Sequence, residues 1–421
     1  MQSSIKLRLT VMNFLQFAVW GAYLTSMGRY LGTAGFGSEI GNFYAMQGLV
    51  SLFMPALMGI VADRWIPAQR LLGLCHMLAG MLMLGVFLYT QTDTPSYPTL
   101  FALYSLSVAF YMPTLALSNS VAYTSLDQAG LDLVKSFPPI RVFGTVGFIC
   151  TMIAVSLLGL EATSGQFAVS AIISLVLALY AQTLPSCPTA PKGQSKSLVE
   201  ALGLRAFVLF KQRKMALFFI FSMLLGVSLQ ITNGFANPFI STFGEIPAYA
   251  DTFGVKYANI LISLSQLSET LCILLIPFAL RRFGIRRVML IAMVAWVLRF
   301  ALLGLGNPGS GVWLFLLSMI VYGVAFDFFN VSGSLFVDKE TDPSIRSSAQ
   351  GLFMIMTNGI GATLGSLGAQ AVINRFVYSQ SEATAILAGW SMSWYIFAAY
   401  AAVVAVLFAL LFRYNTATEA K

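Results

Sequence analysis

The chain has 421 residues, of which 58% are hydrophobic and only 10% are charged, and its formal net charge is +8. Soluble domains carry roughly 25% charged residues, so this composition excludes an ordinary water-soluble fold and indicates an integral membrane protein. The Lys and Arg residues lie between apolar runs rather than on one basic face, which argues against a nucleic-acid-binding protein.

Twelve apolar runs follow one another along the chain, and a helix needs about 20 such residues to cross a bilayer core. The first run continues past Tyr30 without a small-residue cleavage site, so we interpret it as a retained helix rather than a signal peptide. The runs lie near residues 9–31, 38–62, 71–90, 98–123, 138–160, 167–184, 215–240, 257–280, 288–306, 312–337, 348–374 and 389–412.

A stretch rich in Pro, Ser and basic residues interrupts this series near the middle of the chain. We therefore expect an all-α integral membrane protein with three parts. These are an N-terminal six-helix bundle over 1–184, a cytoplasmic linker over 185–214 and a C-terminal six-helix bundle over 215–421.

Basic residues are distributed unevenly among the connections between the runs. Nineteen Lys and Arg residues fall at the termini, in the linker and in alternate connections, whereas Arg29, Lys256 and Arg375 fall on the other side. Because basic residues are retained on the cytoplasmic side, we expect a multi-pass membrane protein with both termini and the linker in the cytoplasm.

Two similar basic turns lie at the same place in each half of the chain. Gly59-x-x-x-Asp63-Arg64 follows the second run, and Arg-Arg-Phe-Gly-Ile-Arg-Arg at 281–287 follows the eighth. Such parallel repeats resemble the major facilitator superfamily, although residues 65–67 (Trp-Ile-Pro) occupy the place of its usual glycine. The resemblance implies a twelve-helix fold and assigns Asp63 and Arg64 to a conformational loop.

Four ionisable side chains lie within the apolar runs, where a charged group is costly and therefore a functional candidate: Arg141, Glu269, Arg299 and Asp327. Glu269 shares a helix face with Gln266, three residues earlier. A carboxylate and an amide in a cavity can bind hydroxyls or a nucleobase edge. The alternative is a buried hydrogen-bonded pair that holds helices together.

Asp327 lies among phenylalanines, and burial there favours the protonated form that suits a group which takes up and releases protons. The alternative is an ion pair with Arg141 or Arg299 that only orders the bundle. Arg141 has Thr145 one turn away and is near enough to its helix start to reach the cytoplasmic surface. Arg299 lies deeper and is interpreted as a structural counter-ion, with a substrate ligand as the alternative.

Amides gather on two further helix faces. Gln230 and Asn233 lie three residues apart beside Gly234 and Pro238, which favours a helix that lines a transport cavity as much as one with interhelical hydrogen bonds. In the first run an indole shares a face with two amides and either stacks on a planar ring or simply packs. These residues are Asn13, Gln16 and Trp20.

The motifs together resemble the nucleoside:proton symporters, the bacterial nucleoside permeases. The matching strings span nearly the whole chain: FLQFAVWG at 14–21, FMPALMGIVAD at 53–63, FPPIRVFGT at 137–145, LQITN at 229–233, SQLSETL at 265–271 and AFDFFN at 325–330. The resemblance implies that Gln230, Asn233, Gln266 and Glu269 contact the nucleoside. It also implies that Arg141, Phe143, Thr145, Phe326 and Asp327 line or gate the same cavity.

Together with these residues, the resemblance implies a proton-coupled importer of purine or pyrimidine nucleosides in the bacterial inner membrane that works by alternating access, with Glu269 or Asp327 as the coupling acid. We expect a monomer in the lipid bilayer, no cofactor and, with His76 as the single histidine, no metal site. A sugar or polyol proton symporter of the same fold is the alternative. A membrane enzyme would need a nucleophile–base pair, and the sequence gives no sign of one, which argues against that class.

Overall fold

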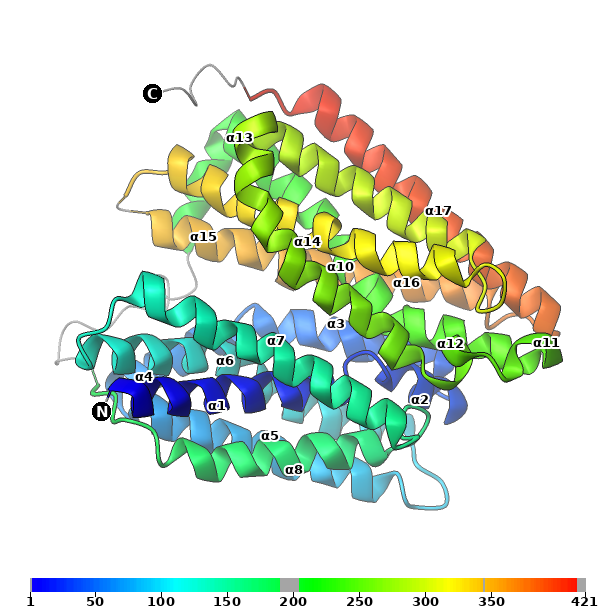
Figure 1. Cartoon of the computed structure of the whole chain (residues 1–421), viewed down its shortest axis with the longest axis horizontal. Coiled ribbons are helices and arrows are strands. Elements are labelled where there is room, and N and C mark those ends of the chain that lie inside the picture. The colour runs from blue at the N-terminus through cyan, green and yellow to red at the C-terminus, as the bar shows by residue number, and fades with distance from the viewer. Residues whose placement is uncertain (1, 190–203, 344, 415–421) are drawn as a thin grey trace. The chain divides into compact units, whose positions relative to one another are not determined.

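The computed structural model describes residues 2–189, 204–343 and 345–414, and all regular secondary structure within them is helical (Figure 1). The chain divides into two compact units. Unit 1 comprises Met1–Tyr30 and Leu49–Leu202, and unit 2 comprises Leu31–Gly48 and Gly203–Lys421.

Unit 1 is built from long apolar helices, and two of them start with a proline in the first turn, where its missing N–H is no loss. The helices are α1 (Gln2–Gly21), the first part of α2 (Met27–Thr33), α4 (Met54–Arg64), α5 (Ala68–Tyr89), α6 (Tyr97–Gln128), α7 (Leu133–Leu157) and α8 (Gly165–Ala181).

Glycines allow α1 and α7 to approach closely. A Cβ added to Gly21 would lie 2.8 Å from the Cα of Phe148, and one added to Gly147 would lie 2.8 Å from the carbonyl carbon of Phe14. Small residues at such crossings are typical of membrane helices, because lipid offers no hydrophobic force between helices and close packing must provide the attraction.

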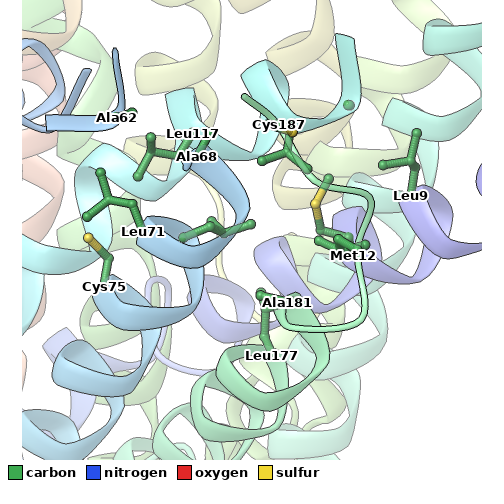
Figure 2. Close-up of a cluster of buried hydrophobic side chains, with 14 of the residues drawn as sticks. Leu9, Met12, Ala62, Ala68, Leu71, Cys75, Leu117, Leu177, Ala181 and Cys187 are labelled. Carbon is green, nitrogen blue, oxygen red and sulfur yellow. The ribbon is translucent and has the colours of Figure 1, made fainter. Parts of the chain in front are cut away.

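An apolar cluster of unit 1 brings the ends of α4 and α5 together with α1, α6 and α8 (Figure 2). Ala62 and Ala68 of this cluster lie on either side of the turn that joins α4 to α5. Buried apolar residues therefore anchor both sides of this turn. Other members drawn in Figure 2 are Leu9, Met12, Leu71, Cys75, Leu117, Leu177, Ala181 and Cys187.

Unit 2 contains the remaining elements, among them a π-helical turn between α15 and α16. They are η1 (Gly37–Glu39), most of α3 (Ile40–Ser51), η2 (Leu204–Lys211), α10 (Arg213–Thr242), η3 (Phe243–Glu245), α11 (Pro247–Ala250), α12 (Phe253–Lys256), α13 (Ala258–Leu305), α14 (Val312–Glu340), α15 (Arg346–Met354), η4 (Ile355–Gly361), α16 (Ala362–Phe376) and α17 (Ala383–Leu411).

Residues 31–48 join unit 2 through contacts between α3 and α16. The side chain of Gln370 accepts a hydrogen bond from the Gly41 N–H, which is an unpaired donor in the first turn of α3, and donates to the Gly37 carbonyl at 3.0 Å. One amide thus caps the start of α3. The predicted linker falls partly on residues 190–203, which lie outside the described residues, and the predicted bundle boundaries stay a prediction.

Among the described helices, nine are long and apolar enough to cross a membrane. One of them, α13, has 48 residues, or roughly 72 Å at 1.5 Å per residue, and bends at Gly284, where φ is 76°. It therefore supplies two spans. With the shorter α8 and with α1, which has 20 residues, the described residues account for the twelve predicted spans.

The first predicted span differs from a single regular helix. α1 ends at Gly21, and α2 begins at Met27 after a turn. Helix-like hydrogen bonds cross this turn, from the Leu24 N–H to the Trp20 carbonyl at 2.9 Å and from the Met27 N–H to the Tyr23 carbonyl at 2.8 Å. The span is thus continuous but distorted.

Candidate functional site

The candidate residues of unit 2 lie mainly on α13 and α14, which pack closely around Gly323. A Cβ at Gly323 would lie 2.7 Å from the Sγ of Cys272, so only glycine fits without displacing α13. The Ser268 hydroxyl also donates to the Ile320 carbonyl across this contact. The close approach places the half-buried Glu269 of α13 beside the helix that carries Asp327.

Tyr322 connects the predicted polar residues of these two helices. Its side chain interacts electrostatically with Gln266, Glu269 and Asp327. Its ring stacks on Phe326 one turn later, with centroids 5.6 Å apart and planes 10° apart. Four sequence-predicted residues therefore gather around one tyrosine that the sequence had not singled out.

The two carboxyl groups of this cluster interact with each other. Asp327 is 5% exposed, and Glu269 is an electrostatic neighbour of it. Among the described residues Asp327 forms no ion pair, and its Oδ2 has no hydrogen-bond partner. The structure therefore does not pair Asp327 with Arg299, which was one of the two arginines in the structural alternative for this aspartate.

Arg299 is held instead by neutral groups. Its Nη1 donates to the Ser318 carbonyl at 2.8 Å and to the Ser265 hydroxyl at 3.4 Å, and its guanidinium carbon lies 4.5 Å from the centre of the Tyr322 ring. A cation over an aromatic face is attracted by the ring quadrupole. Arg299 is only 2% exposed, so it contacts the Tyr322 ring within the protein interior.

Gln230 and Asn233 lie on α10 and bind each other, with the Asn233 amide donating to the Gln230 Oε1 at 2.8 Å. Gln230 is buried, whereas Asn233 is half-buried. Next to them, Gly234 leaves room for the buried Tyr44 ring, whose nearest carbon would be 3.1 Å from a Cβ. Each amide keeps part of its donor and acceptor capacity for another group.

In unit 1 the predicted residues lie on α7. The Arg141 guanidinium carbon is 4.0 Å from the centre of the Phe17 ring of α1, so this arginine stacks on an aromatic ring of the unit. Gly144 leaves the space for this contact, because a Cβ there would lie 2.6 Å from Phe17 and 2.9 Å from the Arg141 Nη1. Thr145 is half-buried and Phe143 is 45% exposed.

The polar residues of the first span face the interior of unit 1. Gln16 donates to the Thr114 hydroxyl at 2.7 Å, and its Oε1 lies 2.8 Å from the His76 Nε2. The His76 Nδ1 lies 2.9 Å from the Ser174 hydroxyl. Gln16 and His76 are both fully buried, so this amide joins four helices and is not free to bind a solute.

The indole of the first span also packs within unit 1. Trp20 lies 6.0 Å from Tyr111 and 6.4 Å from Phe148, measured between ring centroids. The Asn13 amide donates to the Leu9 carbonyl at 3.1 Å. Within the described residues, no three His, Cys, Asp or Glu side chains gather as metal ligands would, and the absence of a metal stays a prediction.

The turn between α4 and α5 carries Asp63 and Arg64. The Trp65 and Ile66 N–H groups both donate to the Val61 carbonyl, at 2.9 and 3.1 Å, and α5 follows after Pro67. All described residues with positive φ are glycines, and none lies in this turn. The backbone here therefore does not require the glycine that is usual in the resembling superfamily.

Two functional candidates were missed from the sequence, Tyr322 and Phe17. Both are ordinary membrane-helix residues, so composition does not distinguish them. Their positions were a usable signal: Tyr322 precedes Phe326 by one turn, and Phe17 adjoins the buried Gln16. Only the contacts with Gln266 and Arg141 reveal what they do.

The crystal structure of the nucleoside transporter NupG has a TM-score of 0.89 with this chain at 46% identity, covering 98% of this chain and 100% of that one. The chain is therefore a multi-pass membrane transporter with the fold of the major facilitator superfamily, not an enzyme. The Nucleoside H+ symporter family profile matches residues 3–417, and the chain belongs to this family.

Two curated relatives of Escherichia coli (strain K12) agree with this assignment. The xanthosine permease is 50% identical over 415 residues, covering 98% of this chain and 97% of the relative. The nucleoside permease NupG is 47% identical over 415 residues with the same coverage. The predicted family, fold class and transport function are thereby confirmed, whereas the roles of individual residues stay predictions.

Proposed function

We propose that this protein imports nucleosides together with protons across the bacterial inner membrane, and that the solute binds at the Tyr322 cluster, defined by Gln266, Glu269, Tyr322, Phe326 and Asp327. Family membership supports the transport reaction. The contacts around Tyr322 carry the assignment of the site, because they gather two carboxyl groups, an amide and a stacked aromatic pair.

The chemistry of this cluster suits a nucleoside. The ribose offers two adjacent hydroxyls to a carboxylate, and the base offers a donor and acceptor edge to an amide such as Gln266. An aromatic ring such as that of Phe326 can cover the face of the base. Gln230 and Asn233 of α10 supply further amide contacts, and Arg141, Phe143 and Thr145 of α7 contribute to the transport cavity in this proposal.

Proton coupling is assigned to Glu269 and Asp327. Because the two carboxyl groups interact, repulsion between their ionised forms is relieved when one of them takes up a proton. A solute that binds the protonated pair more tightly then favours the state that holds both solute and proton. The turn with Asp63 and Arg64 is the proposed conformational loop of alternating access.

The experiment is uptake of radiolabelled uridine and xanthosine into proteoliposomes, with and without an inward proton gradient. Wild-type protein should accumulate nucleoside only with the gradient. Glu269→Gln and Asp327→Asn keep the size of each side chain and remove the titratable group. The coupling residue is the one whose variant still exchanges nucleoside but no longer accumulates it.

Two outcomes would contradict the proposal. Uptake that ignores the gradient in wild-type protein would indicate facilitated transport rather than symport. Inhibition of uridine uptake by free ribose as strongly as by unlabelled uridine would favour the sugar or polyol alternative, because only a nucleoside site needs the base. Substitutions at Gln266 and Glu269 without effect on either substrate would remove the Tyr322 cluster as the site.

The membrane orientation is proposed from the basic residues. Both termini and the linker face the cytoplasm in this proposal, and the protein acts as a monomer with six spans in each half. Labelling of single cysteines with an impermeant maleimide tests the orientation. Cysteines introduced at Ser38 and Gln380 should react from outside intact cells, whereas one introduced at Gln212 should react only after lysis.

A further inference from the structure

A cavity of about 520 Å³ lies within unit 2 where α10 begins and α17 ends, away from the Tyr322 cluster. Three basic residues line it: Arg213 and Lys214 at the start of α10, and Arg413 just after α17. The remaining lining residues are apolar: Leu217, Leu410, Leu411 and Phe412. The cavity thus combines a cationic rim with an apolar wall.

Two of the three basic residues on the cationic rim are not neutralised by an acidic partner among the described residues. Among the described residues neither Arg213 nor Arg413 forms an ion pair, and both are exposed. Lys214 is paired with Glu340 and lies 5.2 Å from the centre of the Tyr414 ring, which holds its position. Two guanidinium groups therefore remain to bind an anion, and this planar group suits phosphate oxygens.

The negative end of the α17 helix does not oppose this charge. Arg286 donates from Nε to the Phe412 carbonyl at 2.6 Å and from Nη2 to the Ala409 carbonyl at 2.7 Å. The Ala409 carbonyl belongs to the last turn of α17 and the Phe412 carbonyl directly follows it, at the end that otherwise presents partial negative charge. The bonds also anchor the residue directly before Arg413, so the rim has a defined geometry.

The apolar wall lies at the end of a helix that is long and apolar enough to span a membrane. Leu410 is 64% exposed and Leu411 is 45% exposed, and both belong to the membrane-spanning helix α17. Arg213 begins the span of α10, and Arg413 follows the span of α17 by two residues. A ligand in this cavity therefore meets cations next to exposed leucines at the ends of two membrane-spanning helices, where lipid headgroups are expected. Such an arrangement fits a lipid better than a soluble anion.

We propose that this cavity, which nothing in the transport reaction uses, is a binding site for an anionic phospholipid. Its phosphate contacts Arg213 and Arg413, and the beginning of an acyl chain packs on Leu410 and Leu411. The site requires only the ends of α10 and α17 and is independent of the solute site.

Native mass spectrometry of the whole protein, titrated with phosphatidylglycerol or phosphatidylcholine, measures the dissociation constant of the first bound lipid. Each basic residue at a membrane surface contributes about fivefold, so Arg213→Gln with Arg413→Gln should weaken phosphatidylglycerol binding roughly 30-fold. Arg281→Gln with Arg282→Gln is the matched control, since it removes the same charge from exposed residues outside the cavity. The control should stay within about twofold of wild type.

Three results would overturn the site: equal binding of both lipids by wild type, equal loss of phosphatidylglycerol binding in both double variants, or displacement of the lipid by inorganic phosphate in modest excess. The last would identify a soluble-anion site. Unchanged uridine uptake by the Arg213/Arg413 variant in phosphatidylcholine vesicles shows that it is folded, so a loss of lipid binding then supports the proposal directly.

Discussion

The guanidinium carbon of Arg299 lies 4.5 Å from the centre of the Tyr322 ring, while the side chain of that tyrosine interacts with Gln266. The buried guanidinium group of Arg299 thus holds one face of the Tyr322 ring. The hydroxyl of Tyr322 belongs to the proposed solute site. This relationship explains how an arginine without a described acidic partner is tolerated at membrane depth.

Tyr322→Phe should weaken transport without unfolding the protein. The change removes the hydroxyl and keeps the ring contacts with Arg299 and Phe326. We expect the KM for uridine to rise about 3- to 10-fold, because a lost hydrogen bond costs roughly 0.5–1.5 kcal/mol. Tyr395→Phe is the control, since its hydroxyl donates to the Gly304 carbonyl elsewhere in unit 2. Equal KM values in the two variants would contradict a role for Tyr322 in binding.

Gly144→Ala should impair transport through Phe17 and Arg141. The new methyl group would lie 2.6 Å from Phe17 and displace the ring from the guanidinium group. Overpacking typically costs about 1–3 kcal/mol, so uptake efficiency should fall about tenfold or more. Gly368→Ala is the matched helical control, because no atom lies within 4 Å of its added Cβ. Normal uptake by Gly144→Ala would show that the stacked arrangement is not required.

His76→Ala should destabilise unit 1 and leave substrate affinity intact. It removes the imidazole partner of the buried Gln16 Oε1, while the Ser174 hydroxyl keeps its bond to the carbonyl of residue 76, and a buried group left without a partner costs about 1–3 kcal/mol. The melting temperature in detergent should fall further than for Cys75→Ala, a buried apolar neighbour on α5. His76→Gln should recover part of the loss. Equal melting temperatures for His76→Ala and Cys75→Ala would show that the network contributes little.

Arg286→Gln should lower the thermal stability of the end of α17. Its two bonds to the Phe412 and Ala409 carbonyls satisfy groups that the helix leaves unpaired, so we expect a loss of roughly 1–2 kcal/mol. Arg282→Gln, an exposed neighbour in the same basic turn, should melt with wild type. The measurement is the melting temperature in neutral detergent, where lipid binding does not contribute. A larger effect of Arg282→Gln would refute the capping role.

Some of these features are properties of short segments and could be predicted from the sequence. Hydropathy over about 20 residues indicates a membrane span whatever its neighbours are, which is why the twelve spans were found, including the two within α13. The cost of charge in lipid also marked Glu269 and Asp327 before any contact was known. The distorted turn after Gly21 was missed, because residues 22–26 contain no charged residue, proline or glycine to mark a break.

By itself, then, the sequence determined the class of protein, the number of spans and which polar side chains needed an explanation, because hydrophobic transfer and charge burial act residue by residue. The tertiary structure decided which partner each of them has. In the structure Gln16 contacts His76, and Arg299 contacts Tyr322. The sequence had left a functional and a structural role open for both residues. Such pairs depend on how each helix is rotated against its neighbours, and close contacts at residues such as Gly323 and Gly144 set that rotation.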